Sequence, residues 1–368
     1  MIEFDDVSKT YPNGARAIEK LSLTAQTGKL TVLVGPSGCG KTTSLRMVNR
    51  LIRPSSGTIR LNGDDAARLD ETELRRRVGY VIQHVGLFPH RTVEHNVAVT
   101  ARLTGKPRRQ AVEVARELLE RVGLGSEFFR RYPWQLSGGQ QQRVGVARAL
   151  AAESEFMLMD EPFSAVDPVV RSQLQDEFLR LQREFGKTIV MVTHDVDEAL
   201  RLGDRIAVFR EGGHIAQFDT PEVLLTAPKD DFVATFLGSE RGYRSLAFRS
   251  GVRVRPAPVP TVTLDERSGP SGPASDEWRL AVGGSGRPIG WLPPFEPVER
   301  ERLLPCGATA GPDASLRDLL NAALSSPSSA GLVLDDDGGV AGVVPIDAVL
   351  PEIAAGTRAT SPNEGAPC

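Results

Sequence analysis

The sequence has little of what marks secreted, membrane-spanning or nucleic-acid-binding proteins. It contains three cysteines among 368 residues. An odd and widely spaced set of three predicts neither a disulfide framework nor a zinc site, and it favours a reducing cytoplasm. No run approaches the roughly 18 consecutive apolar residues that a membrane span requires. The formal net charge of -3 argues against a general nucleic-acid-binding surface, because such surfaces are basic.

The amino-terminus and the composition favour an ordinary globular protein. Three of residues 1–6 are acidic, and the segment lacks the apolar stretch of a signal peptide. Hydrophobic residues make up 40% of the chain and charged residues 25%, which is typical of globular proteins, and the length predicts two or three domains. Up to about residue 237 strand and helix patterns alternate. After it, glycine, proline, alanine and serine increase.

The first part of the chain is predicted to form an α/β domain with a mainly parallel sheet. Segments 30–34, 155–159 and 188–193 are mostly apolar and are separated by helical patterns. Strands that are apolar on both faces and are joined by helices are typical of parallel sheets. The block from about 88 to 150 has helical periodicity, so it predicts a helical subdomain within this domain.

A glycine-rich turn after segment 30–34 predicts a phosphate-binding loop. From Gly35 to Thr42 its residues follow the spacing G-x-x-x-x-G-K-T. The glycines let the backbone fold closely around an anion, and the helix that follows adds its positive end. Lys41 is placed to contact the outer phosphates, and Thr42 is placed to bind Mg²⁺. The competing interpretation is an ordinary strand-turn-helix connection whose glycines serve geometry alone.

Two adjacent carboxylates follow the apolar segment 155–159. Asp160 at the strand end can bind Mg²⁺ directly or through water. Strand alternation predicts that the next residue, Glu161, points away from Asp160. Glu161 is then the candidate for orienting or deprotonating an attacking water. The alternative is a solvated acidic turn, which the phosphate-binding loop disfavours.

A second glycine-rich segment, Leu136–Gln140, precedes a helix predicted over 141–150. It again combines backbone N–H groups with a helix N-terminus, which favours an anion. One nucleotide does not need two such segments from one chain. We therefore expect this segment to complete a site on another copy of the chain, which implies a symmetric dimer with two shared sites.

Together these motifs resemble the ATP-binding cassette (ABC) ATPases. Segment 134–143, Trp-Gln-Leu-Ser-Gly-Gly-Gln-Gln-Gln-Arg, is similar to the signature of that family. The resemblance implies that Tyr11 stacks on adenine and that Gln83 contacts Mg²⁺ and the attacking water. It also implies that loop Ser164–Asp167 contacts the dimer partner and that His194 reaches the γ-phosphate. The implied fold is a P-loop nucleotide hydrolase with an antiparallel β subdomain and a helical subdomain.

The resemblance gives the expected site as a set of residues around ATP and Mg²⁺, with ATP hydrolysis as the reaction. The ATP-binding residues are expected to be Tyr11, Gly35, Pro36, Ser37, Gly38, Cys39, Gly40, Lys41, Thr42 and Thr43. Catalysis is expected of Lys41, Gln83, Glu161 and His194, and Mg²⁺ binding of Thr42, Gln83 and Asp160. The partner's ATP is expected to meet Ser137, Gly138, Gly139 and Gln140. Ser164 and Asp167 are expected at the contact between the two copies.

A finer resemblance points to importer ATPases for quaternary-amine osmoprotectants such as glycine betaine, carnitine and choline. It rests on segments Met159–Arg171 and Thr193–Ala199. It implies a peripheral protein at the cytoplasmic face of the membrane that works with transmembrane permease subunits and an extracytoplasmic solute-binding protein, and not with nucleic acid. The alternatives are import of another small solute, such as a polyamine or an amino acid, and a non-transport ABC protein that acts on DNA or the ribosome.

The loop that carries Leu87 and Phe88 has two interpretations. Bare apolar residues on a loop are costly, so the loop is expected to meet a partner surface. In the ABC family this region receives the permease. The alternative is that both side chains pack inside the helical subdomain.

The C-terminal part resembles a tandem pair of CBS modules. Strand-turn-strand patterns recur at 278–292 and 331–344, and the expected modules span 238–300 and 301–355. A disordered tail is expected at 356–368.

The resemblance to CBS modules departs from their pattern at two positions. Pro293 and Pro345 stand where such modules often carry a hydroxyl residue. The departure argues against a bound adenine nucleotide and leaves dimer stabilisation or sensing of ionic strength as roles for this part.

Overall fold

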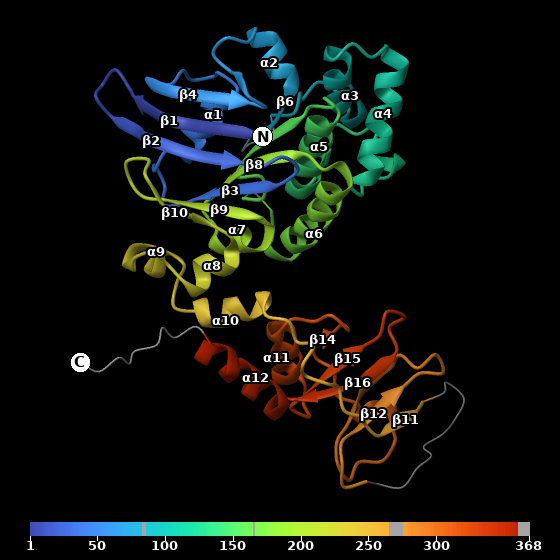
Figure 1. Ribbon diagram of the computed structural model, residues 1–368. Helices are drawn as coiled ribbons and strands as arrows, with labels where there is room; N and C mark the ends of the chain where they lie inside the picture. Colours follow the sequence, from blue (N-terminus) through green and yellow to red (C-terminus); the bar gives the residue numbers. More distant parts are fainter. Residues whose placement is uncertain (83–85, 165, 265–274, 360–368) are drawn as a thin grey trace, which may run out of the picture. The chain divides into compact units, whose positions relative to one another are not determined.

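The computed structural model describes residues 1–82, 86–164, 166–264 and 275–359 (Figure 1). The chain separates into two compact units, residues 1–237 and 238–368. The division falls at the change of composition. Within the described ranges, no helix has both the length and the apolar character needed to cross a bilayer.

A six-stranded sheet forms the centre of the first unit. Its strand order is β10-β9-β3-β8-β7-β6. All neighbouring strands are parallel except β9 and β10, so the predicted mainly parallel sheet is confirmed. The strands are β3 (Leu30–Val34), β6 (Val78–Val81), β7 (Phe156–Asp160), β8 (Thr188–Thr193), β9 (Arg205–Phe209) and β10 (Ile215–Asp219).

The central strand β3 is buried on both faces of the sheet. Leu30, Val32 and Val34 belong to one apolar core, whereas Leu33 belongs to the other. Successive side chains of a strand point to opposite faces, so each face of the sheet has its own core. Strand β3 is thereby fixed from both sides, and so is the start of the glycine-rich loop that follows it.

An antiparallel sheet and several helices flank the central sheet. The antiparallel sheet has the order β2-β1-β4-β5, with β1 (Ile2–Thr10), β2 (Arg16–Ala25), β4 (Ser56–Leu61) and β5 (Asp64–Asp65). The helices are α1 (Lys41–Val48), α2 (Glu71–Arg77), α6 (Pro168–Phe185), α7 (Val196–Leu202), α8 (Pro221–Thr226) and α9 (Asp231–Phe236).

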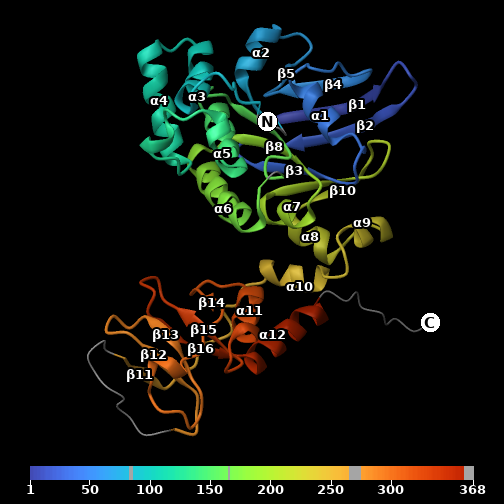
Figure 2. The same ribbon diagram turned by 180° about the vertical axis from the view of Figure 1, so that it is seen from behind.

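A helical subdomain lies at the other side of the unit from β1, β2 and β4, as Figures 1 and 2 both show. It contains α3 (Val93–Leu103), α4 (Arg108–Arg121) and α5 (Gly138–Leu150), with short 3₁₀ turns at Ser126–Phe128 and Pro133–Gln135. Helix α4 buries Ala111, Ala115, Leu118 and Leu119. This spacing is one face of a helix, so the amphipathic pattern docks α4 onto its neighbours.

The second unit repeats one arrangement of three strands. In each sheet the first two strands are parallel and the last two are antiparallel. One sheet contains β11 (Thr261–Thr263), β12 (Arg279–Val282) and β13 (Pro288–Leu292), and the other β14 (Thr309–Ala310), β15 (Ala330–Leu334) and β16 (Val340–Pro345). The helical segments are α10 (Arg241–Ser245), Leu246–Phe248, Arg300–Arg302, α11 (Leu316–Ser325) and α12 (Ile346–Ala359).

The two expected modules of this unit exchange short segments. Ala257, from the first range, forms a β-bridge with Val343 of the second sheet. Leu304, from the second range, forms a bridge with Trp291 of the first sheet. Residues of both sheets also share one apolar core. The boundary expected between residues 300 and 301 is therefore not a packing boundary.

The expected disordered tail at 356–368 needs correction at its start. Helix α12 continues to Ala359, so residues 356–359 are helical. Alanine has the highest helix propensity, and Ala354 and Ala355 favour extension of the helix. Residues 360–368 lie outside the described residues.

Candidate functional site

A pocket of about 440 Å³ opens beside the loop that follows β3. It brings together Tyr11, which directly follows β1, and the predicted loop, and the Tyr11 hydroxyl lies 3.5 Å from Thr43 Oγ1. One wall of the pocket is completed by Ala15, which precedes β2, and by Arg16 and Ala17 at the start of β2. Nothing in the sequence indicated that these residues lie beside the loop. The lining residues are Tyr11, Ala15, Arg16, Ala17, Ser37, Gly38, Gly40, Lys41, Thr42, Thr43 and Glu161.

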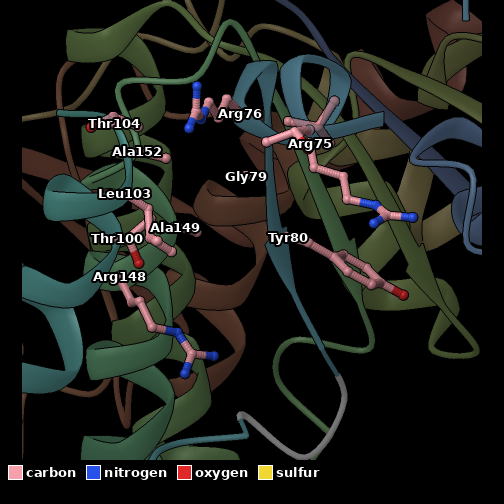
Figure 3. Close-up of a pocket in the computed structure, with 12 residues that line it drawn as sticks. Arg75, Arg76, Gly79, Tyr80, Thr100, Leu103, Thr104, Arg148, Ala149 and Ala152 are labelled. Atoms are coloured by element: carbon pink, nitrogen blue, oxygen red, sulfur yellow. The ribbon is translucent and has the colours of Figure 1, made fainter. Parts of the chain in front are cut away.

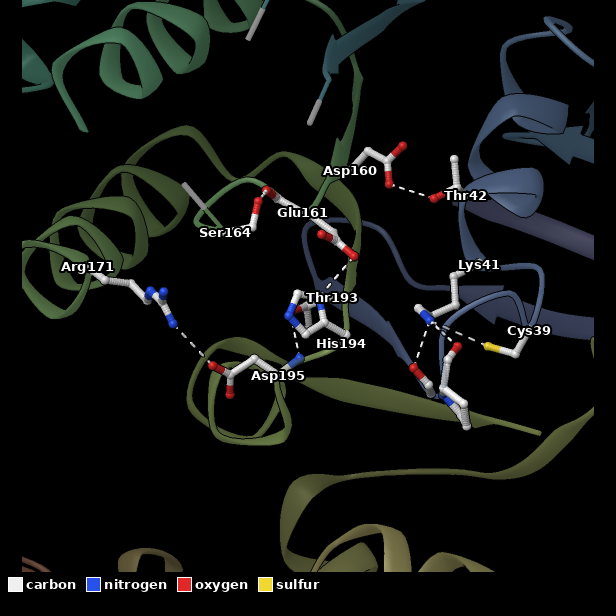
Figure 4. Close-up of polar contacts among 12 residues, drawn as sticks. Cys39, Lys41, Thr42, Asp160, Glu161, Ser164, Arg171, Thr193, His194 and Asp195 are labelled. Carbon is white, nitrogen blue, oxygen red and sulfur yellow. Dashed lines mark hydrogen bonds and ion pairs between the residues drawn. The ribbon is translucent and has the colours of Figure 1, made fainter. Parts of the chain in front are cut away.

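Lys41 lies inside the curve of the loop (Figure 4). Its Nζ donates hydrogen bonds to the carbonyl oxygens of Gly35, at 2.7 Å, and Pro36, at 2.8 Å, and lies 3.5 Å from Cys39 Sγ. The side chain is buried, and so is Cys39. The contacts hold a positive charge at the centre of the loop, where an anion bound by the backbone N–H groups would sit.

Gly40 is the position in this loop that excludes a side chain most strictly. Its φ is +98°, and an added Cβ would lie 2.2 Å from the Ala17 carbonyl oxygen. Gly40→Ala is therefore expected to lower the free energy of unfolding by about 2–5 kcal/mol, from the left-handed backbone and the overlap together. Chemical denaturation measures this change.

Gly38 is the matched control for Gly40. Its φ is +80°, but an added Cβ would meet nothing within 4 Å. Gly38→Ala should then cost only the backbone term of about 1–2 kcal/mol. Equal losses in the two variants would contradict a role for the close approach of Gly40 to Ala17.

The start of α1 and the end of β7 meet at a hydrogen bond. Thr42 Oγ1 donates to Asp160 Oδ1 at 2.8 Å, so the structure brings these two predicted residues together. Burial is the main cause that raises the pKa of the Asp160 carboxyl, and the Thr42 hydrogen bond and the Arg46 charge oppose it. Arg46 was not among the predicted site residues. It stands four residues after Thr42 on α1, so helical spacing could have identified it.

Glu161 and His194 form the second polar pair of the site. Glu161 Oε1 lies 3.0 Å from His194 Nδ1, and the two residues directly follow the neighbouring strands β7 and β8. Asp160 contacts Thr42 and Glu161 contacts His194, but strand alternation is not the reason, because Glu161 lies outside β7 with a φ of +47°. This left-handed turn, not the pleat of the strand, sets the direction of the carboxylate.

The segment Ser137–Gln140 begins a helix, three residues before the start predicted at residue 141. Gln140 N donates to Ser137 Oγ and Ser137 N donates to Gln140 Oε1, at 3.3 and 3.0 Å. This capping box starts α5 at Gly138. The backbone N–H groups of Gly138 and Gly139 consequently lie in the first turn, which is the positive end of the helix.

The helix end at Ser137 does not belong to the pocket of its own chain. None of Ser137, Gly138, Gly139 and Gln140 is among the described residues that line the pocket beside Lys41. Ser137 and Gly138 are instead exposed to solvent.

Two other expected elements are described in part. Gln83 lies outside the described residues, as does Ala165 in the expected dimer-contact loop. In the same loop, Ser164 Oγ donates to the Glu161 carbonyl oxygen at 3.0 Å, and the Asp167 carbonyl oxygen accepts from Arg171 N at 2.7 Å.

In the loop beside the helical subdomain, Leu87 and Phe88 each agree with a different one of the two interpretations. Leu87 packs against the apolar core, as the alternative of internal packing required. Phe88 is 40% exposed, as a contact with a partner surface would require.

Comparison with known proteins agrees with this geometry. A family model described as ABC transporter matches residues 18–164. The chain is 51% identical over 241 residues to the choline transport ATP-binding protein OpuBA of Bacillus subtilis, with 66% of this chain and 63% of that protein covered. It thus spans slightly less than two thirds of that relative. It is 39% identical over 376 residues to the osmoprotectant import ATP-binding protein OsmV of Salmonella typhimurium, with 97% of each covered.

Solved structures give the same result for the fold. The chain is similar to the ATP-binding cassette MJ0796, solved as a dimer in a post-hydrolysis state with ADP and Pi. The TM-score is 0.55 at 32% identity, and the match covers 60% of this chain and 99% of that chain. On the full-length match to OsmV and the nucleotide-binding cassette fold, the chain belongs to the family of ABC transporter ATP-binding proteins.

Proposed function

We propose that this chain is the ATP-hydrolysing subunit of an ABC importer for quaternary-amine osmoprotectants. The assignment of ATP hydrolysis rests on two polar pairs that lie at one edge of the central sheet. Thr42 contacts Asp160, and Glu161 contacts His194. The solute class is taken from relatives whose names specify choline, osmoprotectants, and glycine betaine, carnitine and choline. As the subunit of such an importer, the chain would act at the cytoplasmic face of the membrane.

Thr42 and Asp160 fit Mg²⁺ bound together with the nucleotide. Both offer oxygen atoms, which Mg²⁺ prefers, and these oxygens lie 2.8 Å apart. Burial raises the pKa of Asp160, and a divalent cation would compensate the buried carboxylate. When bound, Mg²⁺ supplies charge neutralisation at the phosphate oxygens.

The chain's own residues supply positioning and proton transfer. Lys41 and the loop N–H groups hold the phosphates, and Tyr11 offers a ring beside Thr43 for the base. His194 fixes the orientation of the Glu161 carboxylate through the 3.0 Å contact. Glu161 then accepts a proton from the attacking water as the general base. Gln83 is proposed to orient the same water.

A second copy of the chain is proposed to complete each site. The N-terminal end of α5, which is exposed at Ser137 and Gly138, presents backbone N–H groups, which favour a phosphate. The loop with Ser164 and Asp167 would contact the other copy. The dimeric cassette among the solved relatives supports this arrangement.

A groove between subdomains is proposed to receive the permease. It has a volume of about 310 Å³, and Figure 3 shows α2 and β6 on one side and α3 and α5 on the other. Arg75, Arg76 and Arg148 line it together with Leu103, which is 66% exposed. Such a lining fits a permease segment with acidic and apolar side chains.

The second unit is proposed to be a CBS-like pair that stabilises the dimer or senses ionic strength. Its second half has the order β14-α11-β15-β16-α12, and the first three-stranded sheet repeats the strand arrangement. Pro293 and Pro345 remain the argument against a bound adenine nucleotide.

ATP hydrolysis in vesicles tests the proposed function. We expect vesicles that contain the cognate permease and solute-binding protein to show ATPase activity stimulated several-fold by a betaine, choline or carnitine. Polyamines and amino acids serve as control solutes, and ionic strength is varied in parallel. Stimulation by a control solute alone would overturn the solute class, and absence of ATP hydrolysis would overturn the enzyme assignment.

A further inference from the structure

One side chain joins the loop Ser164–Asp167 to the turn that carries His194, and Figure 4 shows its contact with Asp195 of that turn. Arg171, in the first turn of α6, donates from Nη2 to the Val166 carbonyl oxygen at 3.1 Å, and its Nη1 lies 3.3 Å from Asp195 Oδ2. Val166 belongs to the loop, and Asp195 directly follows His194. A guanidinium suits this task because its planar fork serves two acceptors in a fixed geometry.

Asp195 is itself held firmly, so the Arg171 contact acts on a rigid turn. Asp195 Oδ1 accepts from Glu198 N at 3.1 Å and caps α7, and Asp195 N donates to Thr193 Oγ1 at 3.0 Å. One helical turn after Arg171, Gln175 Nε2 donates to Glu198 Oε1 at 3.2 Å. Positions four apart lie on one face of a helix, so one face of α6 contacts both Asp195 and Glu198, in the first turn of α7.

The contacts close a ring that contains the proposed general base. Glu161 contacts the loop through Ser164 Oγ, which donates to the Glu161 carbonyl oxygen at 3.0 Å. It contacts His194 through its carboxylate, at 3.0 Å. Arg171 closes the ring, because it contacts Val166 of the loop and Asp195, which directly follows His194. The loop is therefore connected to Glu161 in two ways, through Ser164 and through Arg171, Asp195 and His194.

We propose that Arg171 is a positioning residue that couples the dimer-contact loop to the orientation of His194 and Glu161. The inference rests on the proposed ATPase function. Arg171 does not line the nucleotide pocket, so it acts through other residues. When a second copy engages Ser164–Asp167, the Val166 carbonyl is fixed, and Arg171 fixes Asp195 and thereby His194. Hydrolysis then depends on the assembled dimer.

Arg171→Met in the full-length chain tests this role. It keeps an unbranched side chain and removes both polar contacts. We expect kcat to fall about 10- to 100-fold, because small misplacements of catalytic groups have effects of this size. KM for ATP should change by less than about twofold, since positioning of the reacting groups changes and nucleotide contacts do not. A proportional rise of KM with unchanged kcat would overturn the proposal.

Two conservative variants keep the test decisive if Arg171→Met folds poorly. Arg171→Lys retains the charge but can serve one acceptor in good geometry, so an intermediate kcat is expected. Asp195→Asn retains the Oδ1 acceptor that caps α7 and removes the charge that faces Arg171. Its kcat should match that of Arg171→Met, and the double variant should be no slower than either single variant. Additive losses would contradict a shared bridge.

Arg201 provides a matched control on the same two helices. Its Nη2 lies 2.6 Å from Asp176 Oδ1, and its Nη1 donates to Ser172 Oγ at 2.8 Å. These contacts join α7 to α6, and neither involves the described residues of the loop or of the His194 turn. Arg201→Met should leave kcat within about twofold, as expected for a surface pair.

The outcomes separate the inference from the proposed function. An equal loss of kcat in Arg201→Met and Arg171→Met would assign the effect to general helix packing and overturn the inference. Wild-type hydrolysis combined with an unaffected Arg171→Met variant would overturn the inference alone. A wild-type chain without ATPase activity would overturn the proposed function.

Discussion

Glu161→Gln is expected to lower the kcat for ATP hydrolysis about 10²- to 10⁴-fold, the range that general-base catalysis contributes. Glutamine has the shape of glutamate and keeps an oxygen that can face His194 Nδ1, 3.0 Å away in the wild-type chain. It lacks the basicity to accept a proton from water. Phosphate release at saturating ATP measures the change.

The same variant should retain ATP and the dimer that ATP stabilises. Neither the phosphate-binding loop nor the N-terminal end of α5 is altered, so ATP binding is kept. ATP hydrolysis, the step that would release the dimer, is blocked. Size-exclusion chromatography with and without ATP measures the dimer fraction. Glu211→Gln, at an exposed residue that follows β9, is the control and should behave as the wild-type chain. Brisk steady-state turnover in Glu161→Gln would remove Glu161 from the role of base.

Those parts of the site that rest on local sequence could be predicted. The glycine-rich loop follows a buried strand and precedes a helix, and each of these features has its own sequence pattern. Asp160 could be placed because a strand end fixes the position of its last side chain. The early start of α5 was also readable, since Ser137 and Gln140 have the spacing of a capping box.

Those parts that depend on tertiary packing could not be predicted. The left-handed backbone of Glu161, with a φ of +47°, is uncommon for a residue other than glycine, and no local pattern announces it. Arg171 forms an ion pair with Asp195, and these two residues lie in segments that are distant from each other in the sequence. The exchange of Ala257 and Leu304 between the sheets of the second unit is likewise a long-range pairing.

Gly138→Asp is expected to lower the kcat for ATP hydrolysis at least about 100-fold. The ATP affinity of the isolated chain should stay unchanged. Gly138 is the first residue of α5 and is exposed. An aspartate at a helix N-terminus favours the helix by about 0.3–1 kcal/mol, so the variant should fold. In the proposed dimer the new carboxylate would face the γ-phosphate held by the other copy and repel it.

The two measurements distinguish a shared site from a site confined to one chain. ATP affinity is measured with a fluorescent ATP analogue at protein concentrations too low for dimers, and kcat at concentrations that support them. Gly138→Asn adds a side chain of the same shape without charge, so its kcat should exceed that of Gly138→Asp if repulsion is the cause. If Gly138→Asp instead weakened ATP binding to the isolated chain, the helix end would belong to the pocket of its own chain. Lys41 and Ser137 would then serve the same nucleotide within one copy, and the dimer would not be required for hydrolysis.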